Sequence, residues 1–234
     1  MTAKDFSDSP HDRRCMRDHI RDSLLQRILD GHYAAGQRLV ELNLAREFQV
    51  SQAPVREALR ELEAMGWIES ERYCGSRVRA INHRELAETY ELRAILEQRA
   101  AERTTPCPPE MLDALRATVE QMNRHADNND PAAYAREAFR FHHLIMIQSG
   151  NSTFLRIWNN LHIEARVHYA AQQAGNALPA YARMHVEILH DLEAGNGAAA
   201  GQKIFALLDG LRERLCSDSP DAECDKACPH RFSA

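Results

Sequence analysis

The chain has 234 residues, of which 44% are hydrophobic and 27% are charged. These proportions are those of a well-packed soluble protein, and the length suits two domains. No run approaches the roughly 20 consecutive apolar residues of a membrane-spanning helix. The polar start of the sequence also lacks the apolar core of a secretory signal. We therefore expect a cytoplasmic protein with no membrane contact.

The charge is unevenly distributed along the chain. The net charge is −5, which gives no overall attraction for nucleic acid. Residues 1–81 carry 13 basic and 13 acidic side chains, whereas residues 82–234 carry 16 and 21. Twelve of the 13 cations in the first segment are arginines, which bind phosphate and guanine in a bidentate manner. The six cysteines are scattered, and we expect free thiols.

The N-terminal third of the chain predicts a winged helix-turn-helix. Apolar residues at helical spacing predict three short helices, over residues 15–30, 40–48 and 53–65. Alternating residues next predict two strands, over residues 67–70 and 76–81. Gly75 suits the turn between them, so the two strands form a hairpin, the wing. We expect this domain to cover residues 15–81, after a disordered N-terminal arm over residues 1–14.

From Asn82 onward the pattern is helical. Prolines and glycines fall at the breaks between six segments with helical spacing, which cover residues 83–104, 108–126, 131–149, 152–174, 179–194 and 197–216. We expect an all-α antiparallel bundle over residues 82–216 and a flexible tail over residues 217–234. The predicted fold class is therefore mostly α, with a winged helix-turn-helix before a helical bundle.

The segment that follows Val50 predicts an exposed helix N-terminus. Ser51 is a favourable N-cap, and Pro54 lies among the first helical residues, whose amides have no acceptor within the helix. We expect the Ser51 hydroxyl to accept a hydrogen bond from the Ala53 amide. Helical spacing turns apolar side chains inward, namely Val55, Leu59 and Leu62, and leaves an outer face of Gln52, Ala53, Arg56 and Arg60. Such a face attracts phosphate, and Arg56 adds a charged donor to phosphate or guanine.

Residues 15–81 resemble the DNA-binding domain of the GntR family of winged-helix repressors. The matching residues are Leu39, Glu41, Leu44, Ala45, Val50, Ser51, Pro54 to Leu59, Leu62, Gly66 and Gly75. The helix face and the resemblance together assign DNA binding to Arg38, Ser51, Gln52, Ala53, Pro54, Arg56, Arg60, Gly75 and Arg77. The family commonly has Arg and Thr where this chain has Gln52 and Ala53, a departure that bears on operator preference. The alternative is that these arginines only solvate the surface.

Residues 83–216 resemble the FCD domain, the effector-binding domain of the FadR subgroup of that family. The matching residues are Tyr90 to Arg93, Leu96, Glu97, Phe141, His142, Ser149 to Asn151, His185, Ile188, Leu189 and Gly195. The resemblance implies a small-molecule effector. In many members it also implies a divalent metal such as zinc, held by one Asp and three His, that engages a carboxylate. Here two ligand positions match, His142 and His185, and two do not, Ala138 and Leu207.

Neither Ala138 nor Leu207 can ligate a metal. Replacement ligands would have to come from Glu137, His143, His168 or His190. Three roles therefore remain open for His142 and His185: hydrogen bonding to an effector, metal binding, and ordinary core packing.

Arg93 lies on one helical stripe with Leu86, Tyr90 and Glu97. This places a cation partly on an apolar face. Arg93 either pairs with Glu97, four residues on, or binds an anionic group of an effector.

The sequence thus predicts a homodimeric transcription regulator, not an enzyme, that reads a palindromic DNA operator and binds a small, carboxylate-containing metabolite. Repression is the expected mode. One alternative is a DNA-binding protein that has lost effector and metal sensing. A second is a metal-dependent enzyme, but no catalytic or nucleotide-binding motif supports it. A further candidate metal group has unusual spacing for zinc: Cys216, Cys224, Cys228 and His230.

Overall fold

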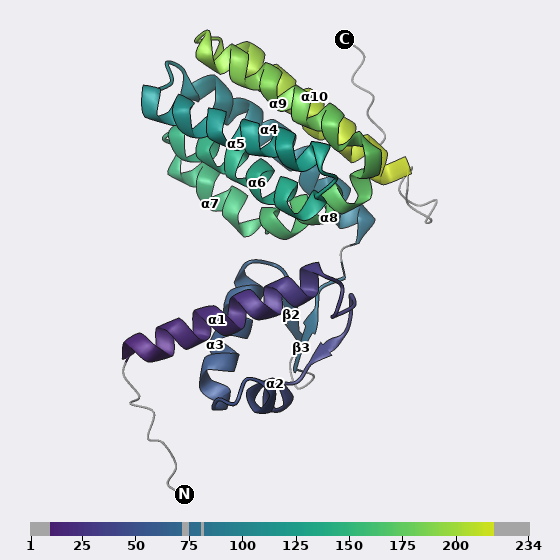
Figure 1. Ribbon diagram of the computed structural model, residues 1–234. Helices are drawn as coiled ribbons and strands as arrows, with labels where there is room; N and C mark the ends of the chain where they lie inside the picture. The colour runs from purple at the N-terminus through teal and green to yellow at the C-terminus, as the bar shows by residue number, and fades with distance from the viewer. Residues whose placement is uncertain (1–9, 72–74, 81, 218–234) are drawn as a thin grey trace, which may run out of the picture. The chain divides into compact units, whose positions relative to one another are not determined.

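The computed structural model describes residues 10–71, 75–80 and 82–217 (Figure 1). The chain divides into two compact units, residues 1–80 and residues 81–234. Three residues of the candidate C-terminal metal group lie outside the described residues: Cys224, Cys228 and His230. Within the part of the chain that is described, no helix is both long and apolar enough to cross a membrane.

The N-terminal unit combines short helices with a small antiparallel sheet, as predicted. Its helices are α1 (Pro10–Leu29), α2 (Glu41–Glu47) and α3 (Gln52–Ala64). Its strands pair in the order β1-β3-β2, and they are β1 (Arg38–Leu39), β2 (Ile68–Glu71) and β3 (Gly75–Val78).

Two details of this unit differ from the expectation. Helix α1 begins at Pro10, inside the segment predicted to be disordered, and Pro10 suits the first turn of a helix. The sequence pattern also did not predict β1. A strand of two residues is too short to alternate visibly, and β1 forms because β3 offers it hydrogen-bond partners.

Packing of α1 against α3 makes the core of the N-terminal unit. Ile20 and Leu24 of α1 are fully buried, as are Val55 and Leu62 of α3. Arg21 of α1 reinforces the contact from outside, because its Nη1 lies 2.9 Å from Oε2 of Glu61. The predicted inward face of α3 is confirmed, and its opposite face is left at the surface.

The C-terminal unit is an all-α bundle, as predicted. Its helices are α4 (His83–Thr104), α5 (Pro109–Asp127), α6 (Pro131–Gln148), α7 (Ser152–Asn160), α8 (Ile163–Ala174), a short 3-10 turn η1 (Gly175–Ala177), α9 (Leu178–Glu193) and α10 (Gly197–Ser217). Side-chain N-caps start three of them, with acceptors from Asn82, Asp130 and Asn151. The predicted single helix over residues 152–174 is wrong. His162 adopts φ of 50°, a left-handed conformation that separates α7 from α8.

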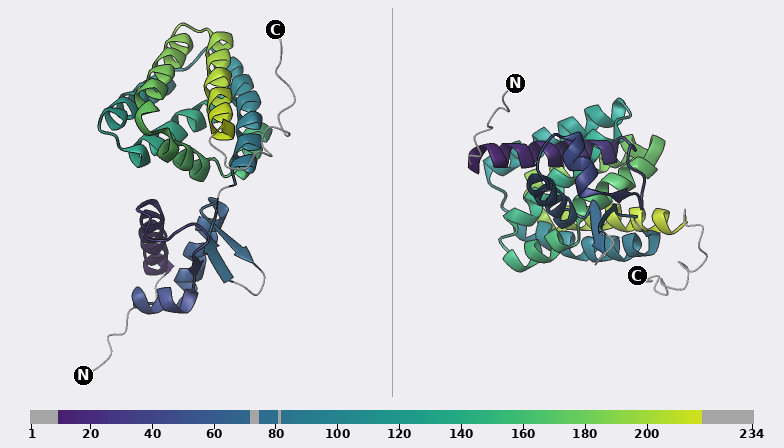
Figure 2. Two further views of the ribbon diagram at one scale, coloured as in Figure 1. Left: turned by 90° about the vertical axis from the view of Figure 1, so that its right-hand side faces the viewer. Right: turned by 90° about the horizontal axis from the view of Figure 1, so that it is seen from below.

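Helices α4 and α10 run alongside each other, as the side view also shows (Figure 2). Two glycines of α10 allow this approach. A Cβ on Gly197 would lie 2.8 Å from the carbonyl oxygen of Ala101, and one on Gly201 would lie 2.8 Å from that of Gln98. Because both obstacles are backbone atoms, the close contact requires glycine.

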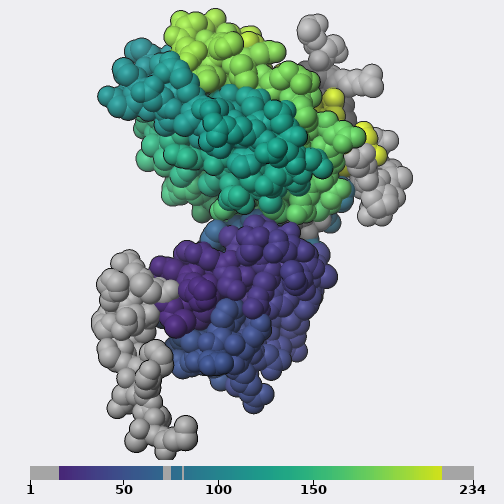
Figure 3. All heavy atoms as spheres, viewed as in Figure 1, coloured from purple at the N-terminus to yellow at the C-terminus, as the bar shows by residue number. Residues whose placement is uncertain are grey.

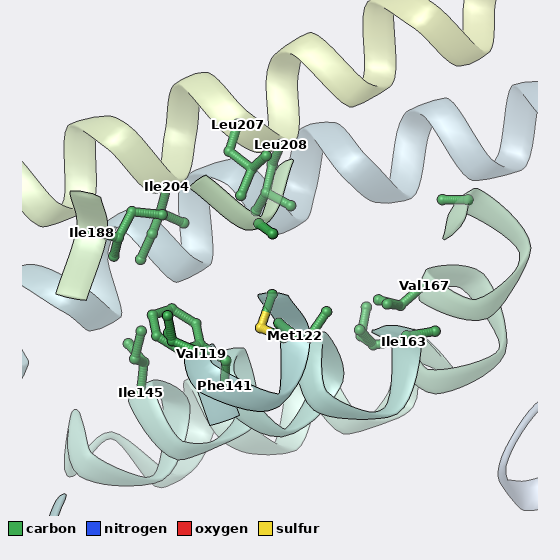
Figure 4. Packing of buried hydrophobic residues seen from close by; sticks show 14 of the residues in the cluster. Val119, Met122, Phe141, Ile145, Ile163, Val167, Ile188, Ile204, Leu207 and Leu208 are labelled. Carbon is green, nitrogen blue, oxygen red and sulfur yellow. The ribbon is translucent and has the colours of Figure 1, made fainter. Parts of the chain in front are cut away.

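Apolar side chains from α4 to α10 fill the interior of the bundle (Figure 4). The outer faces of the helices close over them in the space-filling view (Figure 3). In Figure 4, Leu207 and Leu208 point from α10 into this interior, toward Phe141 of α6. This arrangement surrounds the small cavity described below.

Candidate functional site

The outer face of α3 is accessible at its N-terminal end. Four of its predicted contact residues are exposed: Gln52, Ala53, Arg56 and Arg60. Ser51 is the N-cap in an extended conformation, but its side chain makes no capping hydrogen bond, so the predicted bond to Ala53 is wrong. An N-cap side chain usually accepts from the second or third helical amide, and Pro54 removes the latter. The free N–H groups remain available to an anion.

Arg56 is held in place by Glu41 of α2. Its Nε lies 3.1 Å and its Nη2 2.9 Å from Oε2 of Glu41. The hydrogen bond and the charge of Glu41 raise the pKa of Arg56. Half of the Arg56 side chain is exposed, and an ion pair in such a place is readily exchanged for another anion. Glu41 therefore orients the Arg56 side chain, and a DNA phosphate or base can still replace Glu41 as its partner.

The sheet brings two further predicted residues together. The β1–β3 register places Arg38 opposite Arg77, and the Arg38 guanidinium lies 3.6 Å from where Gly75 would carry a Cβ. Gly75 has φ of +82°, which favours glycine. Like charges opposite each other destabilise an antiparallel pair unless a counter-charge joins them. Arg77 has one in Glu69, at 3.3 Å, while Arg38 is exposed at the edge.

The C-terminal unit contains a cavity of about 30 Å³. Five helices contribute to its wall: α4, α6, α8, α9 and α10. All three predicted effector residues line it, namely Arg93, His142 and His185, and so do Ala138 and Leu207. The other lining residues are Tyr90, Tyr134, Val167, Ala170, Ala171, Ala174, Leu178, Tyr181, Leu208 and Leu211. The structure thus brings together residues that are up to 121 positions apart, from Tyr90 to Leu211.

A chain of buried polar groups runs along one side of this cavity. Arg93 Nε donates to Glu97 Oε1 over 2.8 Å, and Trp158 Nε1 donates to the same oxygen over 2.6 Å. The other carboxylate oxygen, Oε2, lies 2.7 Å from Nδ1 of His142, although the two groups are not aligned as a hydrogen bond. His142 Nε2 lies 3.1 Å from Nε2 of His185. The spacing of residues in the sequence did not predict that Trp158 bonds to these buried polar groups.

The hydrogen bonds restrict the protons on the two imidazoles. His185 Nδ1 lies 2.7 Å from the carbonyl oxygen of Tyr181, so Nδ1 carries a proton and Nε2 is an acceptor in the neutral ring. The neighbouring Nε2 of His142, at 3.1 Å, must then be a donor. This contact therefore accounts for Nε2 of both histidines, while Nδ1 of His142 faces the Glu97 carboxylate.

Burial and charge fix the state of the flanking groups. Burial alone would raise the pKa of Glu97, but Arg93 and then His142 outweigh it and lower this pKa to about 2. Burial also lowers the pKa of His185 to about 3, and the neighbouring His142 acts in the same direction. Glu97 is therefore a carboxylate and His185 a neutral imidazole near neutral pH.

The residues around the cavity do not fit the metal that the family resemblance implies. Ala138 and Leu207 line the same wall as the two histidines and present only apolar atoms. Among the residues that the structure describes, no group of three or more His, Cys, Asp or Glu is placed to hold a metal. The replacement ligands lie elsewhere: His143 stacks on Trp158, and His190 is exposed. Two imidazoles alone make a weak site.

Three buried polar atoms on residues that line the cavity have no hydrogen-bond partner among the described residues, and one of them, Nδ1 of His142, faces the Glu97 carboxylate. The other two are Nη1 of Arg93 and the hydroxyl of Tyr134. Arg93 does pair with Glu97, as one of the two interpretations predicted, but that pair uses Nε and leaves Nη1 over. Sequence reasoning missed Tyr134, although it precedes Ala138 and His142 at four-residue intervals on α6.

The chain matches two family models. The model described as bacterial regulatory proteins, gntR family, matches residues 16–78, and the FCD domain model matches residues 88–210. The chain belongs to the GntR family. It is a DNA-binding transcription regulator, not an enzyme, and its C-terminal unit is the effector-binding FCD domain.

Relatives of known name agree with this assignment. A protein of Paenarthrobacter nicotinovorans named "Probable D-xylose utilization operon transcriptional repressor" is 31% identical over 184 residues, which are 79% of this chain and 81% of that protein. The gluconate operon transcriptional repressor of Bacillus licheniformis is 33% identical over 139 residues, or 59% and 57%.

Solved structures share the fold. A transcriptional regulator GntR from Rhodococcus sp. RHA1 superposes with a TM-score of 0.73 at 21% identity, covering 87% of this chain and 98% of that one. E. coli McbR/YncC gives a TM-score of 0.69 at 20% identity, covering 86% and 97%. The winged helix followed by a helical bundle is thus an architecture already seen in solved structures.

Proposed function

We propose that this regulator is a homodimeric repressor that reads a palindromic operator and responds to a small, carboxylate-containing metabolite. In a two-fold symmetric dimer, two α3 helices enter successive major grooves about one helical turn apart. The protein acts in the cytoplasm, where a bacterial operator is found. The proposed DNA contacts are Arg38, Ser51, Gln52, Ala53, Pro54, Arg56, Arg60, Gly75 and Arg77.

The exposed N-terminal face of α3 carries this proposal. Its unpaired amides and its dipole favour a phosphate, and Arg56 beside them has an ion pair that a phosphate or a guanine edge can replace. Arg38 and Arg77 on the paired strands supply two more cations. Gln52 and Ala53 are the exposed residues nearest the helix start, so they set sequence preference.

The cavity of the FCD domain supports the proposal that this regulator binds an effector. Arg93, His142 and His185 are the proposed effector residues, because all three line the cavity. Effector binding would shift the bundle between two arrangements, with a coupling of about 1–3 kcal/mol to operator affinity. Two relatives are named as operon repressors, which favours repression here as well.

A second candidate function is constitutive DNA binding without sensing. The apolar side chains of Ala138 and Leu207 favour it, because they remove half of the metal site that the family resemblance implies. The two candidates differ in one observable. A sensing protein changes its melting temperature and operator affinity with a metabolite, and a constitutive one changes neither.

A gel-shift titration tests the DNA-binding surface. The duplex is selected from a random library by the wild-type protein, and the salt concentration is fixed. Arg56→Ala should weaken binding roughly 10- to 100-fold, the usual loss of a specific arginine contact. Arg124→Ala, which removes an exposed arginine of α5, should leave it unchanged. Equal affinity of the Arg56→Ala variant and the wild type would refute the assigned role.

A further inference from the structure

The FCD cavity keeps two buried donors unused. Nη1 of Arg93 and the hydroxyl of Tyr134 have no partner among the described residues, and these side chains are 1% and 4% exposed. Buried polar groups in folded proteins are nearly always hydrogen-bonded, and an exception calls for an explanation. Since both residues line one cavity, a ligand that accepts two hydrogen bonds would complete both.

We propose that this cavity binds a short-chain carboxylate directly, with no metal ion, through Arg93 Nη1 and the Tyr134 hydroxyl. The proposal rests on the effector-binding role proposed above and names the class of effector and its mode of recognition. A carboxylate has two acceptor oxygens, and a guanidinium edge is a donor well suited to it.

The charges around Arg93 agree with this mode. Glu97 engages Nε of the guanidinium, which holds the group in place over the ring of Tyr90, 4.7 Å from its centroid. Nη1 is not used in that pair. The charge of Arg93 is thereby oriented by one carboxylate, while Nη1 of the same planar group stays available for another.

Apolar side chains stand at two positions where the family resemblance implies metal ligands. Ala138 and Leu207 stand beside His142 and His185, and the two imidazoles bond to each other rather than converging on a shared ion. An anion in this cavity would therefore bind to hydrogen-bond donors of the protein rather than to a metal ion. The metal-mediated mode implied by the family resemblance is not supported by these residues.

The size and lining of the cavity limit the ligand. Its volume of about 30 Å³ exceeds the roughly 10–15 Å³ that one water requires. The wall also carries two imidazoles and two further tyrosines, but its α8 side is apolar, with the small side chains of Ala170, Ala171 and Ala174. A carboxylate with a short apolar body, of about two to four carbons, matches this space.

Calorimetry and thermal melting on the full chain test the proposal. The protein is purified without a histidine tag, treated with EDTA and dialysed into metal-free buffer. Acetate, propionate and butyrate are the probes, hexanoate tests the size limit, and butyramide is the uncharged control for butyrate. We expect at least one of the three short carboxylates to bind and to raise the melting temperature, with hexanoate weaker and butyramide silent.

Three outcomes would overturn the proposal. They are binding that requires added zinc, binding of butyramide as strong as that of butyrate, and no response to any of the short carboxylates. Operator binding is measured on the same preparation. If it persists while the carboxylates fail, the proposed regulator stands and only this inference is lost.

Two tyrosine variants test the donor without endangering the fold. Tyr134→Phe should weaken carboxylate binding about tenfold, as expected for one lost hydrogen bond to a charged group, without lowering the melting temperature of the free protein. Tyr169→Phe removes a hydroxyl that bonds His83 outside the cavity and should leave carboxylate affinity unchanged. An unaltered affinity in Tyr134→Phe would contradict the assignment. Arg93→Lys tests the second donor, Nη1 of Arg93, in a variant whose fold is first checked by its melting temperature.

Discussion

The same pair of side chains occurs in two very different surroundings. Arg56 and Glu41 of the DNA-binding unit are 2.9 Å apart with side chains 50% and 34% exposed. Arg93 and Glu97 of the FCD domain are 2.8 Å apart, and each is 1% exposed. In water an ion pair is weak and exchangeable, whereas a buried one is costly to break from one side. The first pair therefore suits a contact that opens for DNA, and the second suits a fixed wall.

The largest expected effect breaks the buried pair. Glu97→Gln leaves the Arg93 cation buried without its counter-charge, and we expect a loss of about 3–5 kcal/mol in the free energy of unfolding. Glu41→Gln, the matched change at the exposed pair, should leave the urea midpoint unchanged, because Arg56 is solvated without it. Urea unfolding followed by circular dichroism measures both. Equal midpoints for the two variants would abolish the distinction between the two surroundings.

A second test concerns the packing that buries Arg93 and Glu97. Gly201→Ala places a Cβ against the Gln98 carbonyl oxygen and should destabilise the bundle by roughly 1–3 kcal/mol, because backbone must move. Gly210→Ala, on the same helix with open space at its Cβ, should stabilise it by roughly 0.5–1 kcal/mol. Thermal melts of the two variants should shift in opposite directions. Stabilisation by both substitutions would show that α4 and α10 pack less closely than described.

The smallest effect is a pH dependence of the buried wall. The folded-state pKa of His185 is about 3, below its ordinary 6.5, so between these values the unfolded chain binds a proton that the folded chain does not. Stability should therefore fall as pH falls below 6.5, by at most about 1.4 kcal/mol per pH unit from this group. Urea midpoints at pH 7 and pH 5 measure the slope. His185→Gln should reduce it, and His190→Gln, at an exposed position of the same helix, should not.

The DNA-binding unit was largely predictable because its signals are local. The spacing of Val55, Leu59 and Leu62 fixes which side of α3 is buried, and this decides that Arg56 is exposed. The sequence did not predict β1 or the absence of a Ser51 cap. Strand β1 depends on the backbone position of two residues, and the cap depends on the position of one hydroxyl. Neither produces a repeating pattern in the sequence.

The cavity was predictable only in part. The family resemblance marked His142, His185 and the missing ligands Ala138 and Leu207. It did not single out Tyr134, whose unpaired hydroxyl appears only when α6 faces α4 and α9. The break at His162 was missed for a similar reason. The apolar spacing continues across this residue, whereas the helical backbone conformation is interrupted there.

The sequence by itself determined the winged helix-turn-helix before a helical bundle, the inward face of α3 and the family, because apolar periodicity and a dense local motif are written in consecutive residues. Only the tertiary structure decided that Arg93 and Tyr134 share one cavity, that Glu97 bonds Nε of the guanidinium, and that the two histidines meet through their Nε2 atoms. These facts depend on distances between five helices, and side-chain directions at such interfaces follow from packing rather than from spacing along the chain.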